Sequence, residues 1–186
     1  MRIVGGRFRG LALAEVGRGD PAAHLRPTSD RVRESLFNVL QGGRYGTPLA
    51  GARVLDLFAG TGALGLEALS RGASHATFVE NGPVALDLLG RNIAKARAEG
   101  ETGIISRDAT RPGSCPGAPF DLVFLDPPYG KGLGETALAA ARAGGWLAAG
   151  ALVVWEESRA MTAPEGFTAR ESRRYGGTHV TFLSAP

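Results

Sequence analysis

The fold of this chain is decided by the stretch Asp56-Leu57-Phe58-Ala59-Gly60-Thr61-Gly62-Ala63-Leu64-Gly65. Its three glycines satisfy the pattern GxGxxG directly after an apolar strand, which is typical of a tight turn between a strand and a helix. Glu80 lies 20 residues after Gly60, where an acid can accept hydrogen bonds from two ribose hydroxyls. The stretch therefore predicts a loop that binds a nucleotide-like ligand.

Two further carboxylates favour S-adenosylmethionine (SAM) over a dinucleotide as that ligand. Asp56 ends the first strand, where its charge suits the cationic amino group of a methionine and would repel a pyrophosphate. Asp108 ends the third strand and can accept a hydrogen bond from an adenine amino group, although it can also be a plain turn-forming Asp. The glycine pattern alone would also fit a nicotinamide dehydrogenase or a structural turn. We expect SAM as cofactor and no metal.

Strands and helices alternate outward from this stretch. Strands are expected at 54–58, 76–79, 103–106, 120–125 and 152–155, helices after the glycine turn to Leu69 and at 83–99 and 135–143, and a terminal hairpin at 167–173 and 180–183 around Tyr175-Gly176-Gly177. This alternation indicates an α/β fold with an open, mostly parallel sheet. Ligands of such sheets bind beyond the carboxyl ends of the strands.

The fourth strand leads into Asp126-Pro127-Pro128-Tyr129, which carries the most specific chemical signal in the chain. Two prolines cannot continue a strand ladder, so they fix the directions of the Asp126 carboxylate and the Pro127 carbonyl. Both groups accept hydrogen bonds, and an exocyclic amino group offers two N–H donors. Tyr129 can stack on a flipped base. The motif predicts methyl transfer to an amino nitrogen; the alternative is a rigid structural turn.

The positive charge is concentrated near the N-terminus. Residues 1–44 contain eight arginines and four acids, whereas the other 142 residues carry a net charge of −1. A GC-rich coding bias explains the preference for Arg over Lys but not this segregation, so nucleic acid is the expected partner. The candidate RNA contacts are Arg7, Arg9, Arg26, Arg31 and Arg33.

We expect two parts in the chain, a basic N-terminal segment (1–45) and a catalytic domain (46–186). The first would contain two short strands within 1–16, a loop over 16–26 and a helix capped by Thr28 or Ser29. Arg33 falls on the polar face of that helix. Glu156 and Glu157, at the end of the fifth strand, are interpreted as a surface acidic pair.

Several features of the sequence indicate where in the cell the protein is expected. Cys115 is the only cysteine and lies in a loop without a nearby histidine, so neither a disulfide nor a nucleophile is expected. No apolar run is long enough to span a membrane, and arginines interrupt the N-terminus, which argues against a secretory signal. These features favour a cytoplasmic protein. Trp146 and Trp155 are expected in the core.

Four segments together resemble a known family. They are residues 2–10, 26–38 (Arg-Pro-Thr-Ser-Asp-Arg-Val-Arg-Glu-Ser-Leu-Phe-Asn), 54–68 and 126–129. They are similar to the RsmD family of bacterial 16S rRNA guanine-N2 methyltransferases, within the class I SAM-dependent methyltransferases. The chain departs from the family pattern in its longer loop at 16–26 and in its tail, which lacks a tyrosine-rich ending.

The resemblance implies a seven-stranded, Rossmann-like sheet with a terminal hairpin. It implies that SAM binds, and leaves as S-adenosylhomocysteine, through Asp56, Phe58, Ala59, Gly60, Thr61, Gly62, Glu80, Asn81, Asp108 and Ala109. The implied substrate is a guanine of 16S rRNA, free or within an assembling small ribosomal subunit, and the enzyme is expected to act as a monomer. DNA N6-adenine and protein-glutamine methylases share the glycine loop and the catalytic motif, and they are the alternative.

Overall fold

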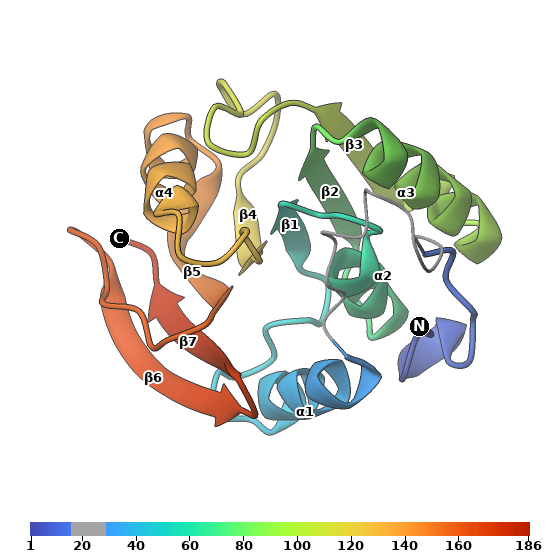
Figure 1. Cartoon of the computed structure of the whole chain (residues 1–186), viewed down its shortest axis with the longest axis horizontal. Coiled ribbons are helices and arrows are strands. Elements are labelled where there is room, and N and C mark those ends of the chain that lie inside the picture. The colour runs from blue at the N-terminus through green and yellow to red at the C-terminus, as the bar shows by residue number, and fades with distance from the viewer. Residues whose placement is uncertain (16–28) are drawn as a thin grey trace.

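The computed structural model describes residues 1–15 and 29–186. In chain order its elements are η1 (Gly6–Phe8, a 3-10 helix), α1 (Asp30–Gln41), β1 (Arg53–Leu57), α2 (Ala63–Ser70), β2 (His75–Glu80), α3 (Pro83–Ala96), η2 (Glu99–Glu101), β3 (Thr102–Ser106), β4 (Phe120–Leu125), α4 (Leu133–Ala143), β5 (Leu147–Glu157), β6 (Thr168–Tyr175) and β7 (Thr178–Ser184) (Figure 1). Arg26, Thr28 and the loop expected at 16–26 lie outside the described residues.

One seven-stranded sheet organises the molecule, in the order β3-β2-β1-β4-β5-β7-β6. Strands β1 to β5 are parallel to one another, whereas β7 runs antiparallel to β5 and to β6. Figure 1 places the β6–β7 hairpin at one end of the sheet and β3 with α3 at the other. The predicted α/β fold with a terminal hairpin is confirmed.

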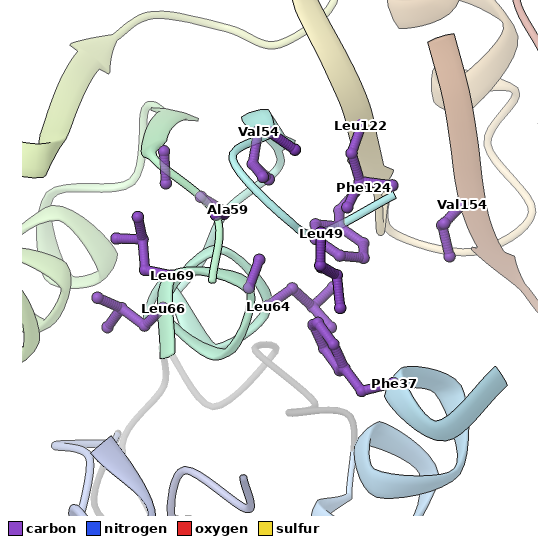
Figure 2. Packing of buried hydrophobic residues seen from close by; sticks show 14 of the residues in the cluster. Phe37, Leu49, Val54, Ala59, Leu64, Leu66, Leu69, Leu122, Phe124 and Val154 are labelled. Atoms are coloured by element: carbon purple, nitrogen blue, oxygen red, sulfur yellow. The ribbon is translucent and has the colours of Figure 1, made fainter. Parts of the chain in front are cut away.

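The sheet is covered on both faces because its central strands alternate their side chains between two apolar clusters. Val54, Phe124 and Val154 point to the face covered by α1, α2 and α3. Leu55 and Val123 point to the opposite face, where they pack with α4. Figure 2 shows Phe37 of α1 and Leu64, Leu66 and Leu69 of α2 among the side chains of the first cluster. Helices therefore cover both faces of the sheet, and the ends of the strands stay uncovered.

Most of the elements expected from the sequence form with small changes of their ends. Strand β4 has the bounds predicted, and Ser29 caps α1 by accepting a hydrogen bond from the Val32 N–H at 3.3 Å. Trp146 and Trp155 are fully buried, as expected. Strand β5 begins five residues before the predicted start at Leu152 and follows β4 with an irregularity in register.

The N-terminal segment differs from the two strands predicted for it. Backbone hydrogen bonds join Ile3 to Leu11 and Gly10, but within residues 1–15 the strand pairing is limited to an isolated antiparallel bridge between Arg2 and Ala12, with η1 at the turn. The glycines and arginines of this segment break the apolar alternation that a longer ladder needs. Ile3 belongs to the same apolar cluster as α2 and the central strands, so the segment shares the core of the catalytic part.

A buried ionic cluster fixes the N-terminal segment, and it contradicts the prediction for Arg33. The carboxylate of Glu67 on α2 accepts hydrogen bonds from the N–H groups of Val4 and Gly5 at 2.8 and 2.9 Å and from Arg71 Nε at 2.7 Å. Arg33 is fully buried: its guanidinium donates to Asp30 at 2.8 Å, and its Nε lies 3.8 Å from Glu67 Oε2. Arg33 was predicted to contact RNA, but it faces this cluster instead of solvent.

Within the described ranges, no helix has the length and apolar character needed to cross a bilayer.

Candidate active site

A cleft of about 1340 Å³ crosses the carboxyl edge of the sheet. One half lies over β1, β2 and β3 and is lined by Asp56, Phe58, Ala59, Gly60, Thr61, Glu80, Asn81, Asp108 and Ala109. The other half lies over β4, β5 and the β6–β7 turn and is lined by Asp126, Pro127, Pro128, Tyr129, Leu133, Glu156, Tyr175, Gly176 and Thr178. Every residue predicted for the cofactor or the chemistry lines this cleft, except Gly62. Because β4 lies between β1 and β5, Asp126 stands where the two halves meet.

The loop after β1 contains residues with positive φ angles, a conformation that residues other than glycine rarely adopt. Phe58 has φ 61° and Gly60 has φ 55°, so a non-glycine residue occupies the left-handed region at the mouth of the cleft. Gly62 has φ 80°, and a Cβ there would lie 2.4 Å from Leu89 Cδ1. A Cβ on Gly65 would lie 2.3 Å from the Phe78 ring. These last two glycines therefore serve close packing of α2 on the core rather than contact with a ligand.

Asn92 links this loop to the N-terminal segment. The side chain is fully buried on α3, and its Nδ2 donates to the backbone carbonyls of Thr61 and Ala14 at 2.9 and 3.1 Å. Its Oδ1 accepts from the Ala14 N–H at 2.6 Å. Asn92 was not singled out from the sequence because an Asn within a helix carries no local signal of such a bridge. It holds the loop and the segment in one arrangement.

The Glu80 carboxylate is held by backbone N–H groups on both of its oxygens. Oε2 accepts from Gly60 at 2.8 Å, and Oε1 accepts from Asn81 and Gly82, each at 2.8 Å. Each carboxylate oxygen has more than one acceptor direction, so oxygens anchored in this way can also accept from ligand hydroxyls. The arrangement fits the ribose-binding role expected for Glu80.

Asp56 is a buried carboxylate in the wall of the cleft. Its Oδ2 accepts a hydrogen bond from the Gly65 N–H at 2.9 Å, and the residue is only 1% exposed. Burial raises the pKa of Asp56 to about 8, and the nearby charge of Glu80 adds to the rise. A cation bound in the cleft would favour the ionised form of Asp56. The charged amino group of a ligand would be such a cation.

Asp108 forms a turn at the end of β3, and its side chain also lines the cleft. Its Oδ1 accepts from the N–H and the hydroxyl of Thr110 at 2.8 and 2.7 Å, as a turn-forming Asp does. These two hydrogen bonds hold the pKa of Asp108 below its usual range. The side chain nevertheless lines the cleft beside the buried Ala109, so an ionised acceptor is present at the end of β3.

The Asp126–Tyr129 segment leaves β4 at the centre of the cleft. The Asp126 N–H contacts the Leu57 carbonyl at 3.4 Å, and Pro127 is buried while Pro128 is exposed. The Tyr129 hydroxyl donates to Glu156 Oε1 at 2.7 Å and lies 3.3 Å from Thr178 Oγ1. Burial raises the pKa of the Tyr129 hydroxyl, and the charges of Glu156 and Asp126 raise it further. Tyr129 is therefore a fixed, neutral ring close to both carboxylates.

The interpretation of Glu156 and Glu157 as a surface pair is wrong. They are 7% and 5% exposed, because β7 pairs with this end of β5 and the loop after β4 covers it. Glu157 Oε2 accepts from the Gly130 N–H at 3.1 Å, and its Oε1 accepts from the backbone and hydroxyl of Ser158 at 2.7 and 2.8 Å. The two acids thus bind both Tyr129 and Gly130, and Glu156 lines the cleft.

The predicted RNA-contacting arginines within residues 1–15 and 29–186 do not lie together. Arg31 is exposed at the start of α1 and lines the cleft with Ser29, Val32 and Ser35. Arg7 pairs with Glu101, which directly precedes β3, so it lies at the amino edge of the parallel sheet, away from the cleft. Arg9 is exposed beside η1.

Residues 1–184 match the model of a family described as "Conserved hypothetical protein 95". The chain belongs to this family. The resemblance to RsmD proteins that the sequence motifs suggested is confirmed by the curated relatives of this chain.

Members of known name or structure resemble the chain over nearly its whole length. Ribosomal RNA small subunit methyltransferase D of Escherichia coli K12 is 37% identical, covering 95% of this chain and 85% of the relative. The protein of that name from Haemophilus influenzae is 33% identical, with 95% and 89% covered. The solved structure of the Escherichia coli protein yhhF is 35% identical and has a TM-score of 0.81, with 100% of this chain and 97% of that chain covered.

Proposed function

We propose that this chain is a SAM-dependent methyltransferase that modifies the exocyclic N2 amino group of a guanine in small-subunit ribosomal RNA. The observation that carries the proposal is the position of Asp126. Its carboxylate lies where the half of the cleft over β1, β2 and β3, which suits a nucleotide-like ligand, meets the half over β4 and β5, which is open to a substrate. The names of the relatives support rRNA of the small subunit as the substrate class.

The residues of the first half fit SAM. The anchored Glu80 carboxylate suits ribose hydroxyls, and Asp108 with Ala109 suits an adenine ring and its amino group. Asp56 provides a buried carboxyl group whose ionised form the cationic amino group of the methionine part would stabilise. Bound there, SAM supplies a methyl group on a sulfonium centre and leaves as S-adenosylhomocysteine.

The residues of the second half position the nitrogen that receives the methyl group. Asp126 and the Pro127 carbonyl each accept one N–H of the amino group, which draws the nitrogen lone pair out of conjugation with the base. The ring of Tyr129 stacks on the base and keeps it in this orientation. The nitrogen loses a proton when its bond to carbon forms, and Asp126 is the carboxylate within reach to receive it. A strong base is unnecessary because that proton is acidic only at this stage.

The proposal is tested by transfer of tritiated methyl groups to small ribosomal subunits purified from a strain that lacks this enzyme. Digestion to nucleosides should give labelled N2-methylguanosine, and mapping should give one nucleotide. The same enzyme should leave unmethylated DNA and glutamine-containing peptides unlabelled, which separates the proposal from the alternative. Label in N6-methyladenine or in N5-methylglutamine would overturn it.

Asp126→Ala supplies the test of the site. Transfer to subunits should be lost, while the dissociation constant for SAM measured by calorimetry should stay within about twofold, because Asp126 holds the substrate rather than the cofactor. Asp121→Ala, an exposed acid on the same strand, is the matched control and should retain transfer. Turnover by Asp126→Ala at the wild-type rate would show that the chemistry occurs elsewhere.

A further inference from the structure

We infer that Glu156 selects guanine among the amino-bearing groups that could enter the cleft, by accepting a hydrogen bond from the N1–H next to the reacting amino group. The inference rests on the proposed function and deepens it, because neither the glycine loop nor the Asp126–Tyr129 segment distinguishes guanine from other amino groups. Glu156 directly lines the substrate half of the cleft.

Three hydrogen-bond acceptors stand at the centre of the cleft. Asp126 and the Pro127 carbonyl stand at the end of β4, and Glu156 is one residue beyond Trp155, which forms with Leu125 the last pair of the β4–β5 ladder toward the cleft. Because Leu125 pairs with Trp155, Asp126 and Glu156 follow the last pair on two neighbouring parallel strands, and the Tyr129 hydroxyl donates to Glu156 Oε1 at 2.7 Å. The wall of the cleft therefore offers one carboxylate beside another, together with a carbonyl.

The chemistry of the neighbouring atom decides which amino group fits such a wall. In guanine the atom beside the amino group is N1–H, a donor, so the edge presents three N–H bonds to three acceptors. In adenine and cytosine the adjacent ring nitrogen is an acceptor, and in glutamine the adjacent atom is a carbonyl oxygen. Any of these would place an acceptor against the Glu156 carboxylate with no hydrogen between the two acceptors, which is costly in a buried site.

The hydrogen bond from Tyr129 keeps Glu156 in place for this contact. The Tyr129 hydroxyl donates to Oε1 at 2.7 Å, and Glu156 is 7% exposed, so its carboxylate is held within the wall rather than extended into solvent. This hydrogen bond thus joins the Tyr129 ring, which stacks on the base, to the Glu156 carboxylate, which contacts the edge of the base. Glu156 is also opposite Val180 in the antiparallel pairing of β5 with β7, and this pairing fixes the backbone that carries the carboxylate.

The test uses small subunits reconstituted with one of three bases at the nucleotide mapped above: guanine, 2-aminopurine or 2,6-diaminopurine. Both analogues retain the 2-amino group but have an acceptor at N1. The wild-type enzyme should prefer guanine in kcat/KM by on the order of 100-fold. A wild-type preference for guanine of less than about threefold over both analogues would overturn the inference. This first measurement needs no variant.

Glu156→Gln then assigns the preference to this residue. Its amide can still accept from Tyr129 and can donate to an N1 acceptor, so the guanine preference should fall by at least about tenfold. The change is read as a ratio of substrates, which cancels any general loss of activity. Tyr129→Phe, which removes the partner of Glu156 but keeps the carboxylate, should lower the rates for all three bases while guanine stays preferred.

The outcomes separate this inference from the proposed function. Guanine N2 methylation by the wild type, with an unchanged base preference in Glu156→Gln, would overturn the role of Glu156 and leave the proposed function standing. Absence of N2-methylguanosine in wild-type reactions with guanine subunits would overturn both. Calorimetric SAM binding by Glu156→Gln, expected within about twofold of the wild type, verifies that the variant is folded.

Discussion

The carboxylate of Glu80 and the backbone N–H of Gly60 are joined by a hydrogen bond of 2.8 Å, so the end of β2 is bound directly to the first glycine of the loop after β1. The same side chain also accepts from the N–H groups of Asn81 and Gly82. Glu80 therefore does two things at once: it shapes the loop and presents an oriented carboxylate to the cleft.

Replacement of Glu80 by Ala should weaken SAM binding by roughly 1–3 kcal/mol, because charge-assisted hydrogen bonds to the ligand and the anchoring of the loop are lost together. Glu80→Gln should lose less, since its amide oxygen can still accept from Gly60. Calorimetric titration with SAM measures both. Glu101→Ala, at the amino edge of the sheet, should leave the dissociation constant unchanged. Equal affinity in Glu80→Ala and the wild type would remove Glu80 from the cofactor site.

The raised pKa of Asp56, about 8, predicts a pH dependence of stability for the protein without ligand. The unfolded chain loses this proton near the ordinary value of 3.8, whereas the folded protein keeps it to about pH 8. Between these limits the folded state binds more protons, so this carboxyl makes the free energy of unfolding fall as pH rises. Below about pH 4 both states are protonated and the group contributes no pH dependence.

Asp56→Asn isolates this contribution, because the amide oxygen can still accept from Gly65 and the side chain no longer titrates. Urea unfolding of both proteins, measured in steps from about pH 5 to pH 8, should show the wild type losing stability relative to the variant. Two curves that stay parallel across the whole range would mean that Asp56 titrates with an ordinary pKa.

The sequence located the strand ends and their acids because these depend on local pattern. Asp56, Glu80, Asp108 and Asp126 each follow or end an apolar strand, and parallel topology brings such positions to one edge. It misjudged the residues whose surroundings come from distant parts of the chain. Glu156 was expected on the surface, but pairing with β7 buries it.

Arg33 shows the same difficulty in a helix. Its position on α1 places it among polar residues in a helical projection, where a solvated charge is the ordinary expectation. The partner that buries it, Glu67, is on α2, and the backbone that closes over it begins at Arg2. Neither contact has a signature within α1 itself. Only the folded arrangement shows that this arginine stabilises the N-terminal segment.

Arg33→Ala should therefore destabilise the protein, by roughly 2–4 kcal/mol, because the buried Glu67 carboxylate loses a nearby positive charge and a space is left in the core. Denaturant unfolding gives the value. Arg9→Ala, an exposed change on the neighbouring segment, should stay within about 0.5 kcal/mol of the wild type. A stability of Arg33→Ala equal to that of Arg9→Ala would contradict the structural role.

RNA binding should depend on arginines according to their distance from the cleft rather than their position in the sequence. Arg31 is exposed and lines the cleft, whereas Arg7 is paired with Glu101 at the amino edge of the sheet. Each arginine that contacts a phosphate releases counterions, so its loss weakens binding and reduces the dependence of affinity on salt.

Arg31→Ala should consequently lower the affinity for unmodified small subunits and reduce the slope of log K against log salt by about 1, whereas Arg7→Ala should leave the slope unchanged. Filter binding between about 50 and 200 mM salt measures both variants against the wild type. If Arg7→Ala changes the slope and Arg31→Ala does not, the RNA approaches from the amino edge. The substrate base would then have to reach Asp126 from a side of the molecule on which the cleft does not open.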